Sequence, residues 1–376
     1  MNIGVVREVQ ASERRVALTP AVVRRLTEKG HTVWAEQGAG ERASFPDKEY
    51  VAAGAKLGYS KAEVVHRCQV VAKVAAPTPE EAALFSPGST LMAFYHLAVK
   101  SRKLMDRLLQ RNLTAIGYEV IQAADGSLPV LAAISEIAGQ MAVSVAAHLL
   151  QSSSGGRGIL LGGSKALGPA HVVVLGSGVM GSTAARTAAA AGARVTAIDI
   201  DRAKLDRLAA ASPGIATLMS GPESIAAAVA AADVLIAAVH LTGRRTPHLV
   251  SRQMVESMRR GSVIIDASID QGGCVETSRP MNLDEPAYVY QGVVHYTAPN
   301  MTSDISHCAS AALAGAVLPC LELIAEKGTG EALRSSSELR SGVYVHAGSC
   351  RQRSLSEALG LPWLPLESQA SMESLP

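Results

Sequence analysis

Three glycines, Gly176, Gly178 and Gly181, form the spacing G-x-G-x-x-G, which is typical of loops that bind the phosphates of a dinucleotide. The spacing alone is common by chance, but here it follows the β-branched run 172–174 and precedes an alanine-rich stretch typical of a helix. Gly176 would permit the tight turn, Gly178 would let a pyrophosphate approach the backbone amides, and Gly181 would let the helix pack against the strand. The alternative is a strand-to-helix turn that binds no ligand; we favour the dinucleotide.

An acidic residue, Asp199, ends the next β-branched run, 18 residues after Gly181. A carboxylate at this place accepts hydrogen bonds from the adenosine ribose hydroxyls, whereas a 2′-phosphate would meet like charge. We therefore expect NAD rather than NADP as the cofactor, although Arg202 is close enough in sequence to weaken that preference.

Hydride transfer to a nicotinamide must be coupled to removal of a proton from an amine or hydroxyl group, which requires an acid/base group. His96 suits this role because it ends the apolar run 91–95, at the end of a strand where α/β proteins bind ligands. Asp270 follows the apolar run 263–265 and precedes Gln-Gly-Gly. A histidine satisfied by the backbone, or an aspartate that holds a loop, would look the same, so position alone does not decide.

The elements around these residues predict an α/β fold of doubly wound, Rossmann-like parallel sheets, because short β-branched runs alternate with longer helical patterns. In the first third we expect strands at Asn2 to Val6, Thr32 to Glu36, Val70 to Val74 and Leu91 to Phe94, and helices at Pro20 to Lys29 and Ser101 to Arg111. Further on we expect a linking helix from Ser135 to Leu150, a second alternation from His171 to about Asn300, and a long helix from Ser303 to Lys327.

Composition narrows the class of protein. With 376 residues, 48% of them hydrophobic, the chain can form two cores, and its formal net charge of only +2 makes nucleic acid an unlikely partner. The sequence has no charged-then-apolar leader and no uninterrupted apolar run of about 18 residues, so we expect a cytoplasmic protein without a membrane partner. The five cysteines never form C-x-x-C, and the ten histidines show no ligand spacing. We expect reduced, mostly buried thiols and no required metal.

Motifs along nearly the whole chain resemble the alanine dehydrogenase family. Besides the glycine loop, the motifs that carry the resemblance are Gly4-Val5-Val6-Arg7-Glu8, Glu13 to Pro20, Gln37 to Glu41, His96-Leu97-Ala98, Tyr118-Glu119, Asp125 to Pro129, Ser135 to Gly139, Gly155 to Gly158, Ile269 to Cys274, Ser278-Arg279-Pro280 and Asn300-Met301. Such a set in this order is highly specific. The resemblance implies a substrate domain from both chain ends (1–134 and 304–376), an NAD domain (135–303), a cleft between them, and a homo-oligomer, usually a hexamer.

The resemblance also implies roles for individual residues. Arg15 would bind the substrate carboxylate, His96 would be the general acid/base, Asp270 would be the catalytic carboxylate, and Asn300 would help to shape the site. Besides the three glycines, it implies cofactor-binding roles for Ser135, Val179, Met180, Asp199, Lys204, Ser220, Val239, Arg279 and Met301. The substrate would be a small L-amino acid or 2-oxo acid.

One departure from the family pattern concerns the substrate. Where the family has Leu-Lys-Val-Lys-Glu-Pro, this chain has Ala72-Lys73-Val74-Ala75-Ala76-Pro77, so Ala75 replaces a lysine that touches the substrate. We favour an NAD-dependent amino-acid dehydrogenase, or an imine or oxo-acid reductase of a biosynthetic pathway, with a remodelled pocket. The alternatives are an alanine dehydrogenase in which an accessible Lys73 serves the site, a non-catalytic NAD-binding protein, and the nucleotide-binding part of a transhydrogenase. The His96 motif and the run 271–274 argue against the last.

Overall fold

The computed structural model describes residues 1–97, 102–241 and 245–366. Two compact units divide the chain: unit 1 contains Met1–Ile134 and the C-terminal part from Ser303, and unit 2 contains Ser135–Leu241 and Arg245–Thr302. Each unit has its own sheet, so the predicted pair of α/β domains is confirmed. Ala98 of the His96 motif, the predicted helix start at Ser101 and the end of the predicted substrate domain from residue 367 lie outside the described residues.

Unit 1 is built on an eight-stranded sheet in the order β15-β14-β6-β5-β4-β1-β2-β3. Its strands are β1 (Asn2–Val5), β2 (Thr32–Glu36), β3 (Lys56–Gly58), β4 (Val70–Ala75), β5 (Thr90–Phe94), β6 (Thr114–Gly117), β14 (Val343–His346) and β15 (Ser349–Cys350). Its helices are α1 (Pro20–Glu28), α2 (Asp47–Ala52), α3 (Lys61–Arg67), α4 (Pro79–Leu84), α5 (Arg102–Gln110), α11 (Ser306–Lys327), α12 (Thr329–Ser335), α13 (Ser337–Ser341) and α14 (Arg353–Leu359), with short 3-10 turns at Glu41–Ala43 and Tyr118–Val120.

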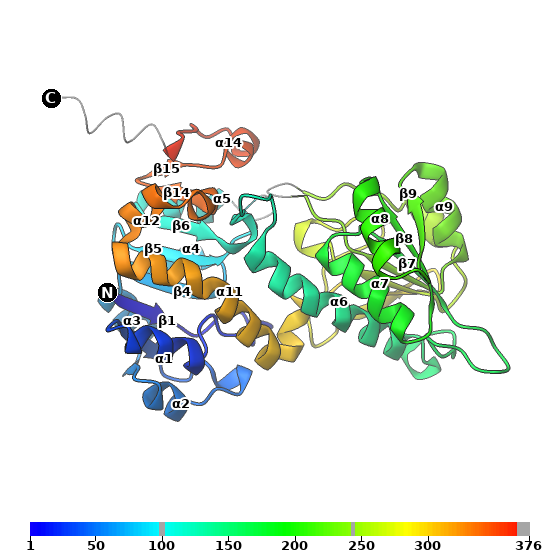
Figure 1. Cartoon of the computed structure of the whole chain (residues 1–376), viewed down its shortest axis with the longest axis horizontal. Helices are drawn as coiled ribbons and strands as arrows, with labels where there is room; N and C mark the ends of the chain where they lie inside the picture. Colours follow the sequence, from blue (N-terminus) through cyan, green and yellow to red (C-terminus); the bar gives the residue numbers. More distant parts are fainter. Residues whose placement is uncertain (98–101, 242–244, 367–376) are drawn as a thin grey trace. The chain divides into compact units, whose positions relative to one another are not determined.

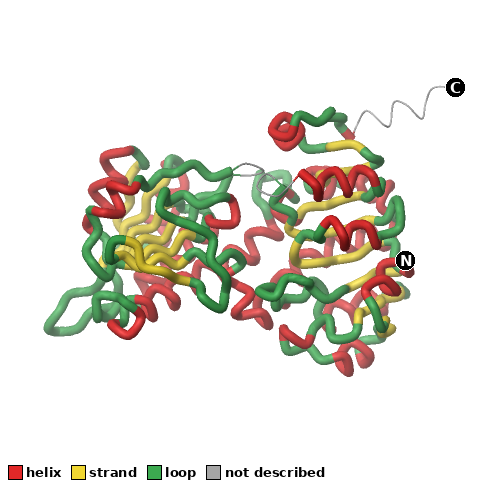
Figure 2. The backbone as a smooth tube through the Cα atoms, turned by 180° about the vertical axis from the view of Figure 1, so that it is seen from behind, coloured by secondary structure: helices red, strands yellow, loops and turns green. Residues whose placement is uncertain are grey.

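Both faces of the unit 1 sheet are buried, as expected of β-branched parallel strands. In β4, Val70, Ala72 and Val74 join one core, whereas Val71 joins the core on the other face. Helix α11 lies on the first face beside α1, and Figure 1 shows it crossing strands β4 and β5; Figure 2 shows helices in front of the sheet on the opposite face. Alternation along the strands therefore places side chains in two separate cores.

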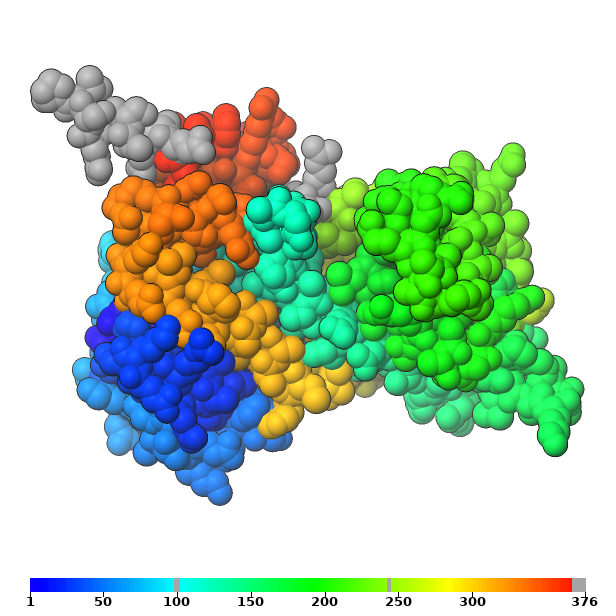
Figure 3. Space-filling view, in the orientation of Figure 1, coloured from blue at the N-terminus to red at the C-terminus, as the bar shows by residue number. Residues whose placement is uncertain are grey.

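The C-terminal part of the chain packs against the N-terminal part and forms unit 1 with it. Strand β14 pairs antiparallel with β6, and Arg25 of α1 forms an ion pair with Glu322 of α11 at 2.8 Å. Figure 3 shows the orange segment packed against the blue N-terminal segment over this region. Residues that lie more than two hundred positions apart in the sequence are thus in direct contact within unit 1.

Unit 2 has a seven-stranded sheet in the order β12-β13-β11-β10-β7-β8-β9, parallel except for β12. Its strands are β7 (His171–Leu175), β8 (Arg194–Asp199), β9 (Ala216–Met219), β10 (Val234–Ala237), β11 (Val263–Asp266), β12 (Ala287–Tyr290) and β13 (Val293–Tyr296). Its helices are α7 (Val179–Ala190), α8 (Arg202–Ala211), α9 (Pro222–Ala231) and α10 (Arg252–Glu256), with 3-10 turns at Ser152–Ser154 and Ile269–Gln271. The order changes direction between β7 and β10, which is where open α/β sheets bind ligands.

Two predicted helix starts were wrong. The linking helix α6 (Pro129–Leu149) begins at Pro129 rather than Ser135, since a proline is well suited to the first turn of a helix, where its missing N–H is not needed. Helix α11 begins at Ser306 rather than Ser303, because the residues before it form a 3-10 turn (Met301–Ile305). Predicted strand bounds differ from the observed bounds by at most one residue.

Helices α6 and α11 are long and apolar enough to cross a membrane by length and composition alone. Both supply core residues of their units: Ala142 and Ala146 of α6 are fully buried in unit 2, and Leu313 and Val317 of α11 in unit 1. The same length and apolar composition are typical of the buried core helices of globular domains. Among the described residues all five cysteines are free, and only Cys308 is exposed.

Candidate active site

The glycine loop has the geometry that its sequence predicts. Gly176 has a φ of 92°, which favours glycine, and a Cβ atom on Gly181 would lie 1.7 Å from the Gly176 carbonyl oxygen. A Cβ atom on Gly178 would have no neighbour within 4 Å, so this backbone faces open space at the start of α7. The side-chain oxygen of Ser177 is buried and has no hydrogen-bond partner among the described residues.

Asp199 ties the glycine loop to the end of β8. Its carboxylate accepts a hydrogen bond from the Ser177 amide at 2.6 Å and one from the Asp201 amide at 2.8 Å. Each carboxylate oxygen has a second lone pair, so the group can still accept from a ribose hydroxyl. The residue is 8% exposed, at the carboxyl end of a parallel strand.

Several other predicted cofactor residues follow the carboxyl ends of neighbouring strands in unit 2. The Ser220 amide donates to the Asp199 carbonyl at 2.9 Å, and the Val239 amide donates to the Ser268 hydroxyl at 3.0 Å. Val179 and Met180 begin α7, and Lys204 lies in the first turn of α8. The remaining three are Ser135 within α6, Met301 buried in the unit 2 core, and Arg279, whose guanidinium lies over the Tyr288 ring.

His96 follows β5 in a left-handed backbone conformation, with a φ of 47°. Its amide donates a hydrogen bond to Glu119 at 2.7 Å, and its ring stacks on Phe94 with 5.9 Å between ring centroids. The ring atom Nδ1 is buried without a hydrogen-bond partner among the described residues. Glu119 belongs to one of the family motifs named above. The sequence gives no sign of its contact with His96, because the two residues are 23 positions apart.

Arg15, the predicted carboxylate binder, is only 4% exposed, and its guanidinium donates two hydrogen bonds to Glu13, Nε to Oε1 at 2.7 Å and Nη2 to Oε2 at 2.5 Å. This two-point contact holds the planar guanidinium in one orientation. Sequence reasoning named Arg15 and missed Glu13, although a carboxylate two residues before an arginine is visible in the sequence.

Asp270 and Asn300, predicted from separate motifs, meet in unit 2. The backbone N–H of Asn300 donates to the Asp270 carboxylate at 3.3 Å, and Asn300 has a left-handed φ of 54°. Beneath the Asp270 loop, the Asp266 carboxylate accepts from the amides of Ser268 and Val275. Burial raises the pKa of Asp266 above its ordinary value, and these hydrogen bonds oppose that shift. The hydrogen bonds to Asp266 therefore fix the loop that carries Asp270.

Lys73 is not available to a substrate. Its side chain is fully buried, with Nζ 3.1 Å from Glu8 and 3.2 Å from Glu81. Burial alone would lower the pKa of Lys73, but the two carboxylates raise it above the ordinary value, so the ammonium stays charged. The alternative in which a solvent-accessible Lys73 serves the substrate site is therefore wrong.

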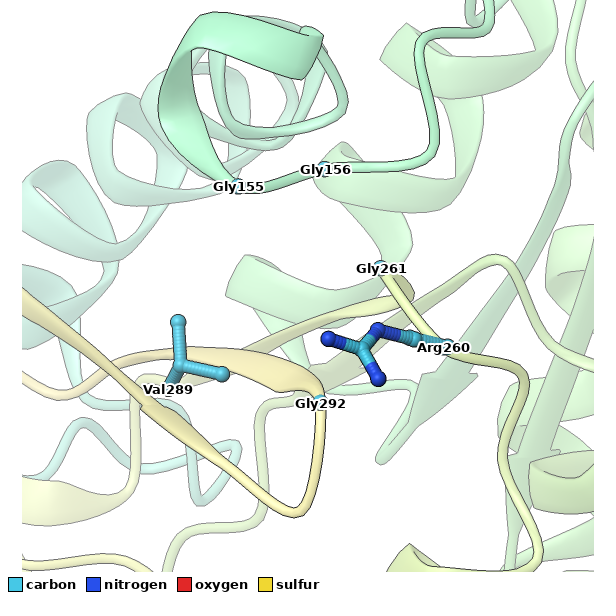
Figure 4. Close-up of a pocket in the computed structure, with 6 residues that line it drawn as sticks. All are labelled: Gly155, Gly156, Arg260, Gly261, Val289 and Gly292. Carbon is cyan, nitrogen blue, oxygen red and sulfur yellow. The ribbon is translucent and has the colours of Figure 1, made fainter.

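A pocket of about 430 Å³ lies elsewhere in unit 2, lined by Gly155, Gly156, Arg260, Gly261, Val289 and Gly292. Figure 4 shows the Arg260 side chain between the segment 155–156 and the turn at Gly292. Gly261 and Gly292 precede β11 and β13, so this pocket is at the amino ends of the strands, whereas the glycine loop is at their carboxyl ends. No predicted site residue lines it. Among the described residues, no group of three His, Cys, Asp or Glu side chains could hold a metal ion.

A parallel sheet with a glycine loop at its switch point and an acid after the next strand defines unit 2 as a dinucleotide-binding α/β domain. Family models described as "Alanine dehydrogenase/PNT" match residues 4–138 (N-terminal domain) and 142–353 (C-terminal domain). The chain belongs to the alanine dehydrogenase/PNT family.

Individual relatives agree with this membership. The chain is 41% identical to an alanine dehydrogenase of Halomonas elongata, over 98% of this chain and 99% of the relative, and 39% identical to one of Mycobacterium tuberculosis, over 96% and 98%. A solved L-alanine dehydrogenase superposes with a TM-score of 0.89 at 41% identity, over 96% of this chain and 99% of that one. A transhydrogenase from Sinorhizobium meliloti gives 0.78 at 25% identity, over 94% and 100%.

Proposed function

We propose that this chain is an NAD-dependent dehydrogenase that interconverts a small L-amino acid with the corresponding 2-oxo acid and ammonia. Full-length similarity to alanine dehydrogenases at 38–41% identity carries the proposal. It is supported by Arg15, His96 and Asp270 all being present, since these residues would be idle in a protein that had abandoned hydride chemistry.

The residues of unit 2 fit the cofactor. The open space at Gly178 and the amides that begin α7 suit a pyrophosphate, and the buried Ser177 hydroxyl lacks a partner. Asp199 suits ribose hydroxyls and disfavours the 2′-phosphate of NADP by like charge. Bound NAD would supply the hydride acceptor through its nicotinamide ring.

The protein residues would bind the substrate and move its protons. Arg15, held by Glu13, would bind the substrate carboxylate in two hydrogen bonds. His96 would take the proton that leaves the amine during oxidation and return it during reductive amination, and Asp270 would assist as water adds to the imine and ammonia leaves. Asn300 would shape the site through its contact with Asp270.

Ala75 puts the identity of the substrate in question. With Lys73 bound to Glu8 and Glu81, no second cation replaces the missing lysine from this strand. A pocket without that ammonium would hold pyruvate less tightly and would favour a 2-oxo acid with a larger apolar side chain, or an imine.

The test is oxidation of NADH with ammonia and a series of 2-oxo acids (pyruvate, glyoxylate and longer homologues), for the wild-type protein, Ala75→Lys and Ala75→Met. Methionine matches lysine in length without charge, so comparison of the two variants isolates the effect of the ammonium group.

We expect pyruvate turnover to rise only in Ala75→Lys. High pyruvate turnover by the wild-type protein would contradict the remodelled pocket. Turnover of no acceptor by either the wild type or Ala75→Lys would contradict the proposed function and would favour a non-catalytic NAD-binding protein, an alternative that only Ala75 supports.

We also propose that the protein acts in the cytoplasm on a small molecule, as a homo-oligomer, with the hexamer inherited from the family resemblance. Light scattering coupled to size-exclusion chromatography measures the oligomer directly: a mass near six times 39.0 kDa is expected, and a monomeric mass would contradict the assembly.

A further inference from the structure

The carboxylate of Glu119 is buried directly behind the backbone of His96. Its oxygen Oε1 accepts from the His96 amide at 2.7 Å, from the Tyr95 amide at 3.1 Å and from the Tyr344 hydroxyl at 2.9 Å. Glu119 is only 2% exposed. Three donors thus converge on one carboxylate that has no role in the proposed chemistry.

Two successive amides that point at one anion require an unusual backbone. His96 has a φ of 47°, a region that non-glycine residues rarely adopt and that persists only where the surroundings hold it. An anion facing consecutive N–H groups provides such a hold. Gly117 keeps the space open, because a Cβ atom there would lie 2.2 Å from the Tyr344 ring and 3.2 Å from Glu119.

The backbone is what orients the His96 ring. Nδ1 is buried and has no hydrogen-bond partner among the described residues, so no described contact of that atom fixes the ring angle. The stacking contact with Phe94, at an interplanar angle of 6°, constrains one face only. The direction in which the imidazole projects therefore depends strongly on the backbone conformation at His96.

We propose that Glu119 is a positioning residue, which holds the His96 backbone in its left-handed conformation and so aims the imidazole at the reacting group. The proposal rests on the acid/base role given to His96 above. Glu119 acts through the two amides and does not touch the substrate.

The experiment compares Glu119→Ala with Tyr344→Phe in the full-length protein. Tyr344→Phe is the matched control, since it removes one of the three donors and leaves the carboxylate with both amides. The first readout is the rate at which diethylpyrocarbonate modifies His96, measured by peptide mass spectrometry against the exposed His248 as internal reference. We expect Glu119→Ala to raise the His96 rate about tenfold through local opening of this segment, and Tyr344→Phe to leave it unchanged.

This readout needs no activity, so failure of the proposed function does not obscure it. An unchanged His96 rate in Glu119→Ala that still binds NADH would overturn the proposal. If Glu119→Ala does not fold, Glu119→Gln takes its place and is judged by the same rate, with a smaller rise expected. Where wild-type turnover is measurable, kcat should fall about 100-fold in Glu119→Ala with little change in KM; an equal fall in Tyr344→Phe would contradict a role through the amides.

Discussion

Lys73 and Glu8 form an ion pair in the interior of unit 1, with 3.1 Å between Nζ and Oε2 and side-chain exposures of 0% and 3%. Glu8 also accepts a hydrogen bond from the Val74 amide at 2.7 Å, next to Ala75. Burial raises the pKa of Glu8, and the Lys73 charge opposes this shift. The pair is thus a structural element of β4 and keeps the lysine away from solvent.

Replacing Lys73 with methionine should destabilise the protein without a specific effect on substrate binding. Removal of the ammonium leaves the buried Glu8 carboxylate without an opposite charge, which costs about 3–5 kcal/mol. Lys61→Met is the matched control, because Lys61 also contacts Glu81 but is more exposed. Urea unfolding measures the difference. If Lys73 bound the substrate, its replacement would instead raise KM and leave the free energy of unfolding nearly unchanged.

Two glycines of the same loop should respond differently to alanine. Gly178→Ala meets no atom within 4 Å, so the protein should keep its stability but lose NADH affinity, because the new methyl group occupies the space of the pyrophosphate. Gly181→Ala places Cβ 1.7 Å from the Gly176 carbonyl oxygen, so it should lower the melting temperature as well. Fluorescence titration with NADH and thermal unfolding separate the two effects. Full NADH affinity in Gly178→Ala would mean that the cofactor does not approach this loop.

Asp199→Asn should weaken NADH binding and reduce the preference for NADH over NADPH. Loss of the charge removes like-charge repulsion of a 2′-phosphate, worth about 1–4 kcal/mol at 4 Å, and weakens the hold on the Ser177 amide. Dissociation constants for both cofactors, measured at fixed ionic strength, give the ratio. Asp206→Asn, an exposed acid on α8, serves as the control. An unchanged ratio would argue against a ribose contact at Asp199.

Unit 2 should lose stability as the pH falls through about 6.5. Burial lowers the pKa of His295 below its ordinary value of 6.5, and burial likewise lowers that of His171. The unfolded chain therefore binds protons that the folded chain does not, so the stabilisation is full above pH 6.5 and decreases below it. Unfolding free energies at pH 7.5 and 5.5 should differ less in His295→Gln than in the wild type. An equal reduction in His248→Gln, an exposed control, would exclude burial as the cause.

Local features of the sequence predicted the fold well. The strand 32–36 and the glycine loop are encoded within a few neighbouring residues, by β-branched runs and by glycines where the backbone needs them, and the structure has them in place. The two wrong helix starts also have a local cause, a proline that begins α6 and a 3-10 turn that precedes α11.

The contacts that hold the candidate site are mostly distant in sequence and could not be read from periodicity. Glu119 reaches His96 across 23 positions, and Asp270 meets Asn300 across 30. Both His96 and Asn300 also have left-handed backbones, which the periodicity of the sequence does not predict. The burial of Lys73 similarly depends on Glu8, 65 positions earlier along the chain.

Strand β14 has a consequence for synthesis of the protein. It pairs with β6 and carries β15 on its other side, so β6 is an unpaired edge strand of the unit 1 sheet until β14 has left the ribosome. Unit 2 draws all its strands from the stretch between residues 171 and 296 and can close its sheet earlier. A nascent chain therefore carries a finished second domain while the first still exposes strand β6, and any truncation before residue 343 should produce an aggregating product rather than a smaller enzyme.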